Sequence, residues 1–120
     1  MVFLKNCFVT TTSDIDCIPI IHDVRYAIRD SQINDGLVTI TIPGSDASLW
    51  ISQSQEGFEK LSQHHCPSLS LPFQKKELIL DPQLMIYLID FSKTGKRREF
   101  CVQVLGDAPQ QPQQQGGRRR

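Results

Sequence analysis

The chain has 120 residues, 39% of them hydrophobic, and its 13 basic and 13 acidic residues give a formal net charge of zero. This length suits one domain with a modest core and is too short for two. Residues 1–106 carry 10 basic and 12 acidic residues, so the charge gives no case for nucleic acid as the main partner.

The first predicted elements are a strand and a helix. Residues 2–12 are apolar and β-branched, which predicts a strand, and residues 13–16 read as a polar connection. Pro19 suits the first turn of a helix, where the missing N–H costs nothing. Gly36 suits a left-handed cap after the helix. The apolar face of this helix is predicted to consist of Ile20, Ile21, Val24, Ala27 and Ile28.

Residues 35–54 form the stretch around which the fold is organised. Residues 37–42 alternate between apolar residues and threonine, which is the pattern of a half-buried strand. Residues 47–53 repeat this signal and place Trp50 on the face opposite Leu49 and Ile51. The cluster Pro43-Gly44-Ser45-Asp46 between the two strands predicts a turn on which side-chain chemistry could be displayed.

The following region is predicted to be a short helix and a hairpin. Residues 55–63 are weakly helical. Residues 69–73 and 77–80 have the composition of two short strands, and the polar residues 74–76 between them predict a hairpin.

The last predicted pair consists of residues 84–91 and 99–105. The first is a nearly continuous apolar strand, which must be covered on both faces, and the second alternates cleanly. Thr94-Gly95 between them predicts that the two pair as a hairpin. After Gly106 the chain is rich in Pro, Gln, Gly and Arg, so we expect one domain over residues 1–106 and a disordered tail over 107–120.

Two groups of residues are candidates for catalysis or metal binding. Ser45 beside Asp46 pairs a nucleophile with an acid, although no base is evident and an ordinary polar turn explains them equally. His64 and His65 could each offer an imidazole to a metal. Because a transition metal generally takes three or four ligands, we read them as a surface pair and expect no metal or other cofactor.

The candidate ligand-binding residues are one aromatic and three basic side chains. Trp50 could stack on a ring-shaped ligand, although a large aromatic in a strand also suits a core or an interface. Lys96, Arg97 and Arg98 form the basic cluster of a turn and could bind an anion, or they could simply be solvated. With the three terminal arginines they could also give weak, salt-sensitive affinity for nucleic acid.

Cysteine usage and hydropathy indicate the compartment. No Cys-x-x-Cys pair occurs, which favours reduced, buried thiols over disulfides. No apolar run approaches the ~18 residues of a membrane span, and residues 1–9 do not form a signal peptide. We therefore expect a cytoplasmic protein without membrane contact. The four cysteines are Cys7, Cys17, Cys66 and Cys101.

Three segments resemble the YjbQ family, small proteins sometimes named secondary thiamine-phosphate synthases. They are Ile21-His22-Asp23-Val24-Arg25, Asp35-Gly36-Leu37-Val38-Thr39 and Val102-Gln103-Val104-Leu105-Gly106. The resemblance covers residues 2–106 and implies a homotrimer. Together with the predicted elements it indicates an α+β fold, with about seven mostly antiparallel strands in a sheet sandwich or barrel and one main helix.

The chain departs from the family at its site. The family turn reads Pro-His-Thr-Thr/Ser-Ala, whereas the sequence here is Pro43-Gly44-Ser45-Asp46-Ala47. The family's acidic, His-containing segment is shortened to residues 55–68, and the place of its Gly-Thr-Trp-Gln motif is taken by residues 81–84. The resemblance therefore implies a non-catalytic or reduced member with an oligomeric or ligand-binding role. The alternative is an enzyme with thiamine-phosphate synthase-like activity, so catalysis stays open.

Overall fold

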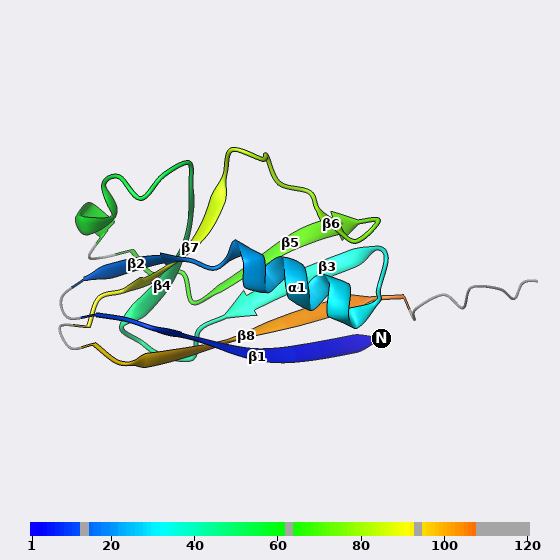
Figure 1. Ribbon diagram of the computed structural model, residues 1–120, viewed down its shortest axis with the longest axis horizontal. Helices are drawn as coiled ribbons and strands as arrows, with labels where there is room; N and C mark the ends of the chain where they lie inside the picture. Colours follow the sequence, from blue (N-terminus) through cyan, green and yellow to red (C-terminus); the bar gives the residue numbers. More distant parts are fainter. Residues whose placement is uncertain (13–14, 62–63, 93–94, 108–120) are drawn as a thin grey trace, which may run out of the picture.

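The computed structural model describes residues 1–12, 15–61, 64–92 and 95–107. These residues have an α+β fold of mostly antiparallel strands with one main helix, as predicted (Figure 1). The predicted tail lies, apart from Asp107, outside the described residues. The elements in chain order are β1 (Val2–Thr10), β2 (Asp16–Pro19), α1 (Ile21–Ser31), β3 (Gly36–Thr41), β4 (Ala47–Ser52), the 3-10 helix η1 (Phe58–Leu61), β5 (Ser68–Gln74), β6 (Glu77–Leu78), β7 (Met85–Asp90) and β8 (Arg97–Gly106).

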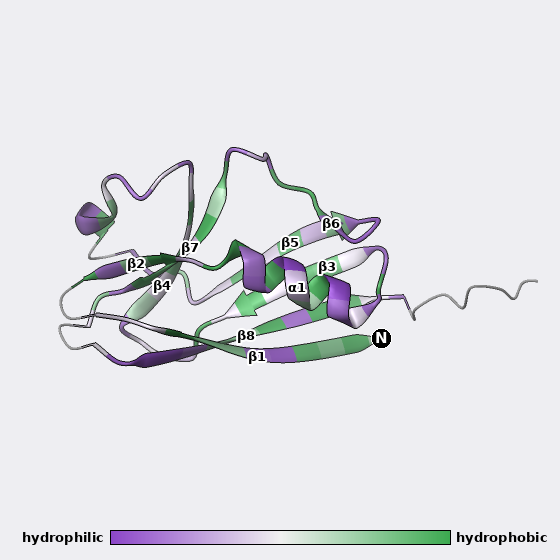
Figure 2. Ribbon diagram, in the orientation of Figure 1, coloured by the Kyte–Doolittle hydropathy of each residue, from purple (hydrophilic) through white to green (hydrophobic). Residues whose placement is uncertain are grey.

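The strands form two separate antiparallel sheets. The larger has the order β1-β8-β3-β5-β6 and the smaller has the order β2-β7-β4. Helix α1 and the smaller sheet lie next to each other over one face of the larger sheet (Figure 1). The core lies between these two layers, and Figure 2 shows the resulting alternation of hydrophobic and hydrophilic residues along α1 and β8.

The predicted helical face is confirmed, but both ends of the helix differ from the prediction. All five predicted apolar residues are buried, with at most 2% of their surface exposed. Pro19 ends strand β2 instead of opening the helix. Gln32, with φ 60°, takes the left-handed position after the helix. Gly36 instead begins β3, where a Cβ would clash with the Leu105 carbonyl oxygen on the neighbouring strand.

Strand β2 was missed because it is short and bounded by polar residues and proline. It pairs antiparallel with β7, with Cys17 opposite Ile89. It lies at the edge of the smaller sheet, where a proline without an N–H is tolerated. Residues 13–14 of the predicted connection lie outside the described residues.

The predicted hairpin of the last two strands is wrong. Strand β7 is the central strand of the smaller sheet, between β2 and β4, whereas β8 lies between β1 and β3 in the larger one. Thr94 of the expected turn lies outside the described residues. The hairpin predicted around residues 74–76 is confirmed as β5–β6, with Gln74 opposite Glu77. Of the helix predicted at residues 55–63, the described part forms only η1.

The apolar strand β7 is covered on both faces by its own chain. Ile86 and Leu88 belong to the main core, while Tyr87 and Ile89 form a second cluster to which Trp50 adds its partly buried ring. The strand is therefore part of the protein's own interior. No helix in the described part of the chain is long and apolar enough to span a membrane.

Candidate functional site

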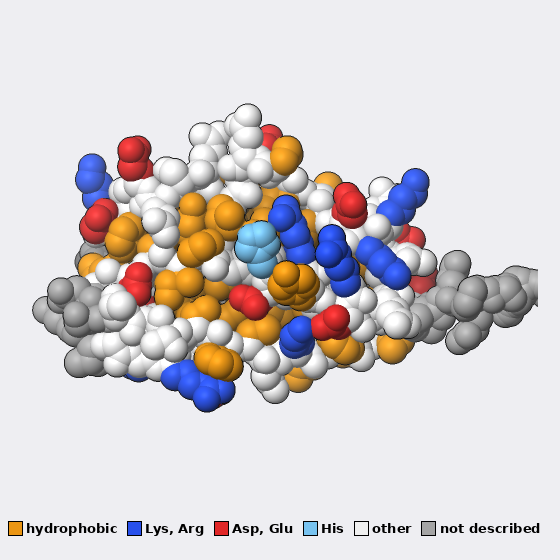
Figure 3. Space-filling model, viewed as in Figure 1, with side chains coloured by type: hydrophobic (Ala, Val, Ile, Leu, Met, Phe, Trp, Pro, Cys, Tyr) orange, Lys and Arg blue, Asp and Glu red, His pale blue; other side chains and the backbone are white. Residues whose placement is uncertain are grey.

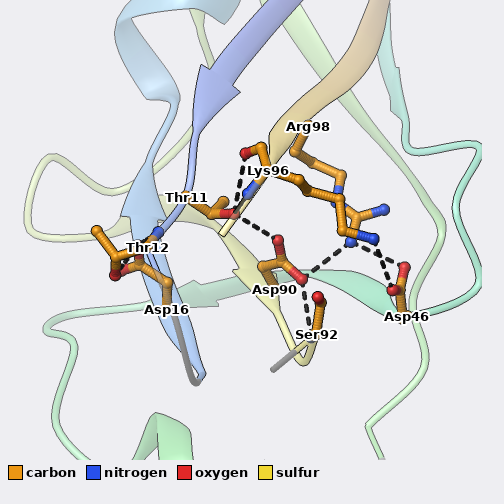
Figure 4. A network of polar contacts seen from close by, with 8 residues as sticks. All are labelled: Thr11, Thr12, Asp16, Asp46, Asp90, Ser92, Lys96 and Arg98. Atoms are coloured by element: carbon orange, nitrogen blue, oxygen red, sulfur yellow. Dashed lines mark hydrogen bonds and ion pairs between the residues drawn. The ribbon is translucent and has the colours of Figure 1, made fainter. Parts of the chain in front are cut away.

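The turn at residues 43–46 carries the chain from one sheet to the other. It follows β3 of the larger sheet and leads into β4 of the smaller one. At the same place the end of β7, the start of β8 and the exit of β1 come together. This convergence joins charged and polar side chains from four separate parts of the sequence, and Figure 4 shows the network that they form.

Arg98 is the centre of this network. Its Nη2 lies 2.9 Å from Oδ1 of Asp90 and 2.8 Å from Oδ1 of Asp46. The side chains of Arg98 and Asp90 are only 8% and 1% exposed, so this ion pair is shielded from water. Burial alone would lower the pKa of Arg98, but the hydrogen bond and charge of Asp90, helped by Asp46, raise it above its ordinary value. The guanidinium is therefore firmly cationic.

Asp90 is also held from its other side. Its Oδ2 accepts a hydrogen bond of 2.8 Å from the Thr11 hydroxyl, and its Oδ1 accepts one of 2.8 Å from the Ser92 backbone N–H. Thr11 is fixed in turn, because its N–H donates to the Lys96 carbonyl oxygen at 2.8 Å. A buried carboxylate needs such donors as well as its cation, so the position of Asp90 is strongly determined.

Asp46 is the accessible end of the network. Its side chain is 43% exposed, and its Oδ2 lies 3.3 Å from Nζ of Lys96. Partial burial would raise its pKa, but the hydrogen bond from Lys96 and the charge of Arg98 outweigh this effect and lower the pKa below its ordinary value. Asp46 is therefore ionised at neutral pH and is a weak base.

Replacing Asp46 by asparagine is expected to lower the free energy of unfolding by less than about 1 kcal/mol at neutral pH, since this end of the network is solvated. Because the pKa of Asp46 is lower in the folded than in the unfolded chain, its contribution is present above the ordinary value of 3.8 and is lost as pH falls through the folded value. Urea unfolding at a series of pH values should show the wild-type advantage shrinking below 3.8. An advantage that grows towards acid would contradict this.

Gly44 lies next to the Arg98 guanidinium. A Cβ at position 44 would clash with Nη1 of Arg98 and would lie 3.3 Å from Oδ1 of Asp46. The guanidinium therefore takes the space into which a side chain at position 44 would extend. Within the described residues, Nε of Arg98 is a buried nitrogen without a hydrogen-bond partner. The carboxylates of Asp46 and Asp90 therefore pair with Nη2 of the guanidinium, while its Nε donates no hydrogen bond.

The remaining sequence candidates lie apart from this network. Ser45 is exposed on the turn, and the described residues place no base beside it. Trp50 packs against Tyr87 with ring centroids 5.7 Å apart. Arg97, next to Arg98 along the strand, points to the other face, where its guanidinium lies 3.9 Å from the centre of the Phe8 ring. Of the six catalytic and ligand candidates, the structure thus brings together Asp46, Lys96 and Arg98.

The two histidines point to different surroundings. Nε2 of His64 lies 2.9 Å from the Leu49 carbonyl oxygen, whereas His65 is exposed. Among the residues that the structure describes, no three His, Cys, Asp or Glu side chains are close enough together to hold a metal ion. The four cysteines are free thiols, and burial, with Asp16 and Glu59 nearby, raises the pKa of Cys17 to about 11.

Thr11 and Asp90 are the site residues that the sequence reasoning missed. Asp90 ends a strand that is otherwise apolar, and a charged residue in such a run signals a buried partner. The pattern contains no signal for Thr11, because a threonine is ordinary at the end of a β-strand.

Comparison with known proteins shows which solved structures share this fold. No family model matches the chain, and no curated protein matches it. A C. acetobutylicum protein of known structure is similar to the chain, with 17% sequence identity and a TM-score of 0.78, over 86% of this chain and 99% of that one. A YbjQ-like protein of unknown function from Sulfolobus solfataricus has 15% identity and a TM-score of 0.76, over 89% of this chain and 99% of that one. An uncharacterised YjbQ-family protein from Clostridium acetobutylicum has 16% identity and a TM-score of 0.74, over 84% of this chain and 99% of that one. The chain shares the fold of these proteins over nearly their full length.

Proposed function

We propose that this chain is a non-catalytic member of the YjbQ family whose role is to bind a ligand or to assemble. The shared fold and the sequence resemblance over residues 2–106 support the family. The observation that carries the loss of catalysis is the position of Arg98 over Gly44, because position 44 corresponds to the family's histidine and its side-chain space is already filled.

The charges of the network support the same proposal. Its two cations, Arg98 and Lys96, each lie within 3.3 Å of a carboxylate of Asp46 or Asp90. General acid–base catalysis needs a group that exchanges a proton near neutral pH. Asp46 is the exposed acid of the network, and its lowered pKa makes it unsuited to that task. The network therefore suits a structural link between the two sheets.

The assembly that we propose is a cytoplasmic homotrimer without a resident metal or other cofactor. The family resemblance supports three subunits. The outer face of the larger sheet offers a contact surface, because Val2, Leu105 and Leu37 form one exposed apolar row across β1, β8 and β3. Light scattering is expected to return the mass of three chains. A monomer mass at micromolar concentration would overturn this assembly.

The proposal is tested by an activity measurement. We expect that transfer of a pyrimidine pyrophosphate onto a thiazole phosphate will not exceed the rate without protein. A positioned acid or base is worth about 10²–10⁴-fold, and Asp46, the exposed acid of the network, is a weak base. Elemental analysis of the dialysed protein measures its metal content, and we expect no stoichiometric transition metal. Turnover by the wild-type chain that Asp46→Asn abolishes at an unchanged Tm would instead establish the alternative, a thiamine-phosphate synthase-like enzyme.

A further inference from the structure

A basic pocket lies between α1 and the β5–β6 hairpin, away from the Arg98 network. The cavity has a volume of about 210 Å³ and is lined by Arg25, Arg29, Lys76, Glu77 and Leu78. Figure 3 shows Lys and Arg side chains gathered over α1 and towards this hairpin. Three cations and one carboxylate line the pocket, so its surroundings are positively charged.

The two arginines are placed by the helix. Arg25 and Arg29 are separated by four residues, which puts them one above the other on the exposed face of α1. The opposite face of the helix is buried in the core, so the helix cannot rotate to move them. Both guanidinium groups therefore reach the same hollow from one side.

Lys76 is held on the other side by a tight turn. The Lys76 N–H donates to the Asn34 carbonyl oxygen at 2.8 Å, and the Lys75 N–H donates to Oδ1 of Asp35 at 3.0 Å. The backbone of the turn is thus tied to the connection between α1 and β3. As a result, the backbone from which the Lys76 side chain extends is fixed opposite the two arginines.

The conformation of this turn is unfavourable for lysine. Lys75 and Lys76 have φ values of 54° and 65°, a left-handed region that two-residue hairpin turns normally fill with Asn-Gly. Strain of this kind persists where the surrounding structure over-determines it, and it is enriched at functional sites. The hairpin therefore keeps a lysine charge at the pocket where an Asn-Gly turn would suit the backbone better.

The cations of the pocket differ from the other basic side chains in their ion pairs. Four basic residues elsewhere, Lys5, Lys96, Arg97 and Arg98, each have a carboxylate within 4.0 Å. Within the described parts of the chain, the ion pairs include none from Arg25, Arg29 or Lys76. Glu77 lines the same pocket without pairing with any of them. Their combined charge is thus available to an anion.

We propose that this pocket binds the phosphate group of a small molecule. The two guanidinium groups supply planar forks that match phosphate oxygens, and Lys76 adds a point charge from the opposite side. Because the charges converge on one small hollow instead of following a line, the pocket favours a single compact dianion over a nucleic-acid strand. The proposal is independent of the proposed function, since none of these residues belongs to the Arg98 network.

The test is a titration of the full-length, ¹⁵N-labelled protein with inorganic phosphate and with pyrophosphate, followed by NMR. We expect saturable shift changes confined to residues around Arg25, Arg29 and Lys76. Arg29→Gln should weaken pyrophosphate binding by about tenfold, the loss of one charge-assisted contact. Glu77→Gln should strengthen it. The matched control is Lys60→Gln in η1, which lies outside the pocket and should bind as the wild type does.

Lys76→Gly separates binding from folding. Glycine relieves the left-handed conformation, so this variant should have a higher Tm than the wild type while binding pyrophosphate about tenfold more weakly. The proposal is overturned if the shift changes do not saturate, or if Lys60→Gln weakens binding as much as Arg29→Gln. A short oligothymidine that binds more tightly than pyrophosphate would show a nucleic-acid surface instead and would equally overturn it.

Discussion

Replacing Arg98 by methionine is expected to lower the free energy of unfolding by about 3–5 kcal/mol, because it leaves a buried carboxylate without its cation. The Asp90 side chain is 1% exposed, so water cannot take the place of the lost guanidinium. Methionine fills much of the same space, so the loss reflects the missing charge more than a cavity. Urea unfolding monitored by circular dichroism measures this difference.

Arg97→Met is the matched control, since it makes the same substitution at the next residue of the same strand. The Arg97 side chain is 62% exposed and contacts Phe8 and Glu99 at the surface, so its loss should cost less than about 1 kcal/mol. A double variant, Arg98→Met with Asp90→Ala, should lose less than the two single variants summed. Equal losses in the free energy of unfolding for Arg97→Met and Arg98→Met would show that the buried pair of Arg98 and Asp90 stabilises the protein no more than a surface contact does.

Gly44→His is expected to destabilise the protein by about 1–3 kcal/mol, the usual cost of inserting a side chain into filled space. The new side chain would meet Nη1 of Arg98, which must move away from the carboxylates of Asp46 and Asp90. We also expect no catalytic activity from this variant. The imidazole would displace the network, and under the proposed function the other segments of the YjbQ family's site are absent as well.

A double-mutant cycle between positions 44 and 98 tests this mechanism. In the Arg98→Met background the guanidinium is gone, so Gly44→His should cost less there than in the wild type, and the two effects should not add. Gly44→Ala in both backgrounds is the control for the added Cβ alone. Strictly additive losses, within about 0.5 kcal/mol, would mean that Arg98 does not occupy the space of the histidine.

The sequence by itself determined the buried face of those elements whose hydrophobic pattern can be read locally. The apolar face of α1 was correct because a helix repeats every 3.6 residues and its stripe can be read locally. The alternation along residues 99–105 correctly indicated a strand with one face in the core. The β5–β6 hairpin was also predictable, since its two strands are joined by a turn of adjacent residues. These signals depend on neighbours in the sequence.

The pairing of strands that are far apart in the sequence was decided only by the tertiary structure. The apolar run of β7 indicates burial on both faces, but it contains no information about which strands lie beside it. Its partners turned out to be β2 and β4 instead of β8. Hydrogen bonds between strands are made by the backbone, which is the same for every residue type, so the side-chain pattern constrains the burial of a strand more than its partners.

The candidate site, like the pairing of distant strands, could not be assembled from the sequence. Asp46, Lys96 and Arg98 were recognisable as polar groups on two predicted turns, but nothing in the sequence indicated that these turns meet. Thr11 and Asp90 are 79 residues apart, and Asp46 and Lys96 are 50 residues apart. Strands β3 and β4 belong to different sheets, as do β7 and β8, so the chain changes sheet after β3 and again after β7. The side chains at these two changes of sheet, among them Asp46 and Lys96, meet at one end of the core. Charge can be read from composition, but the pairing of charges depends on distances that only the packed sheets establish.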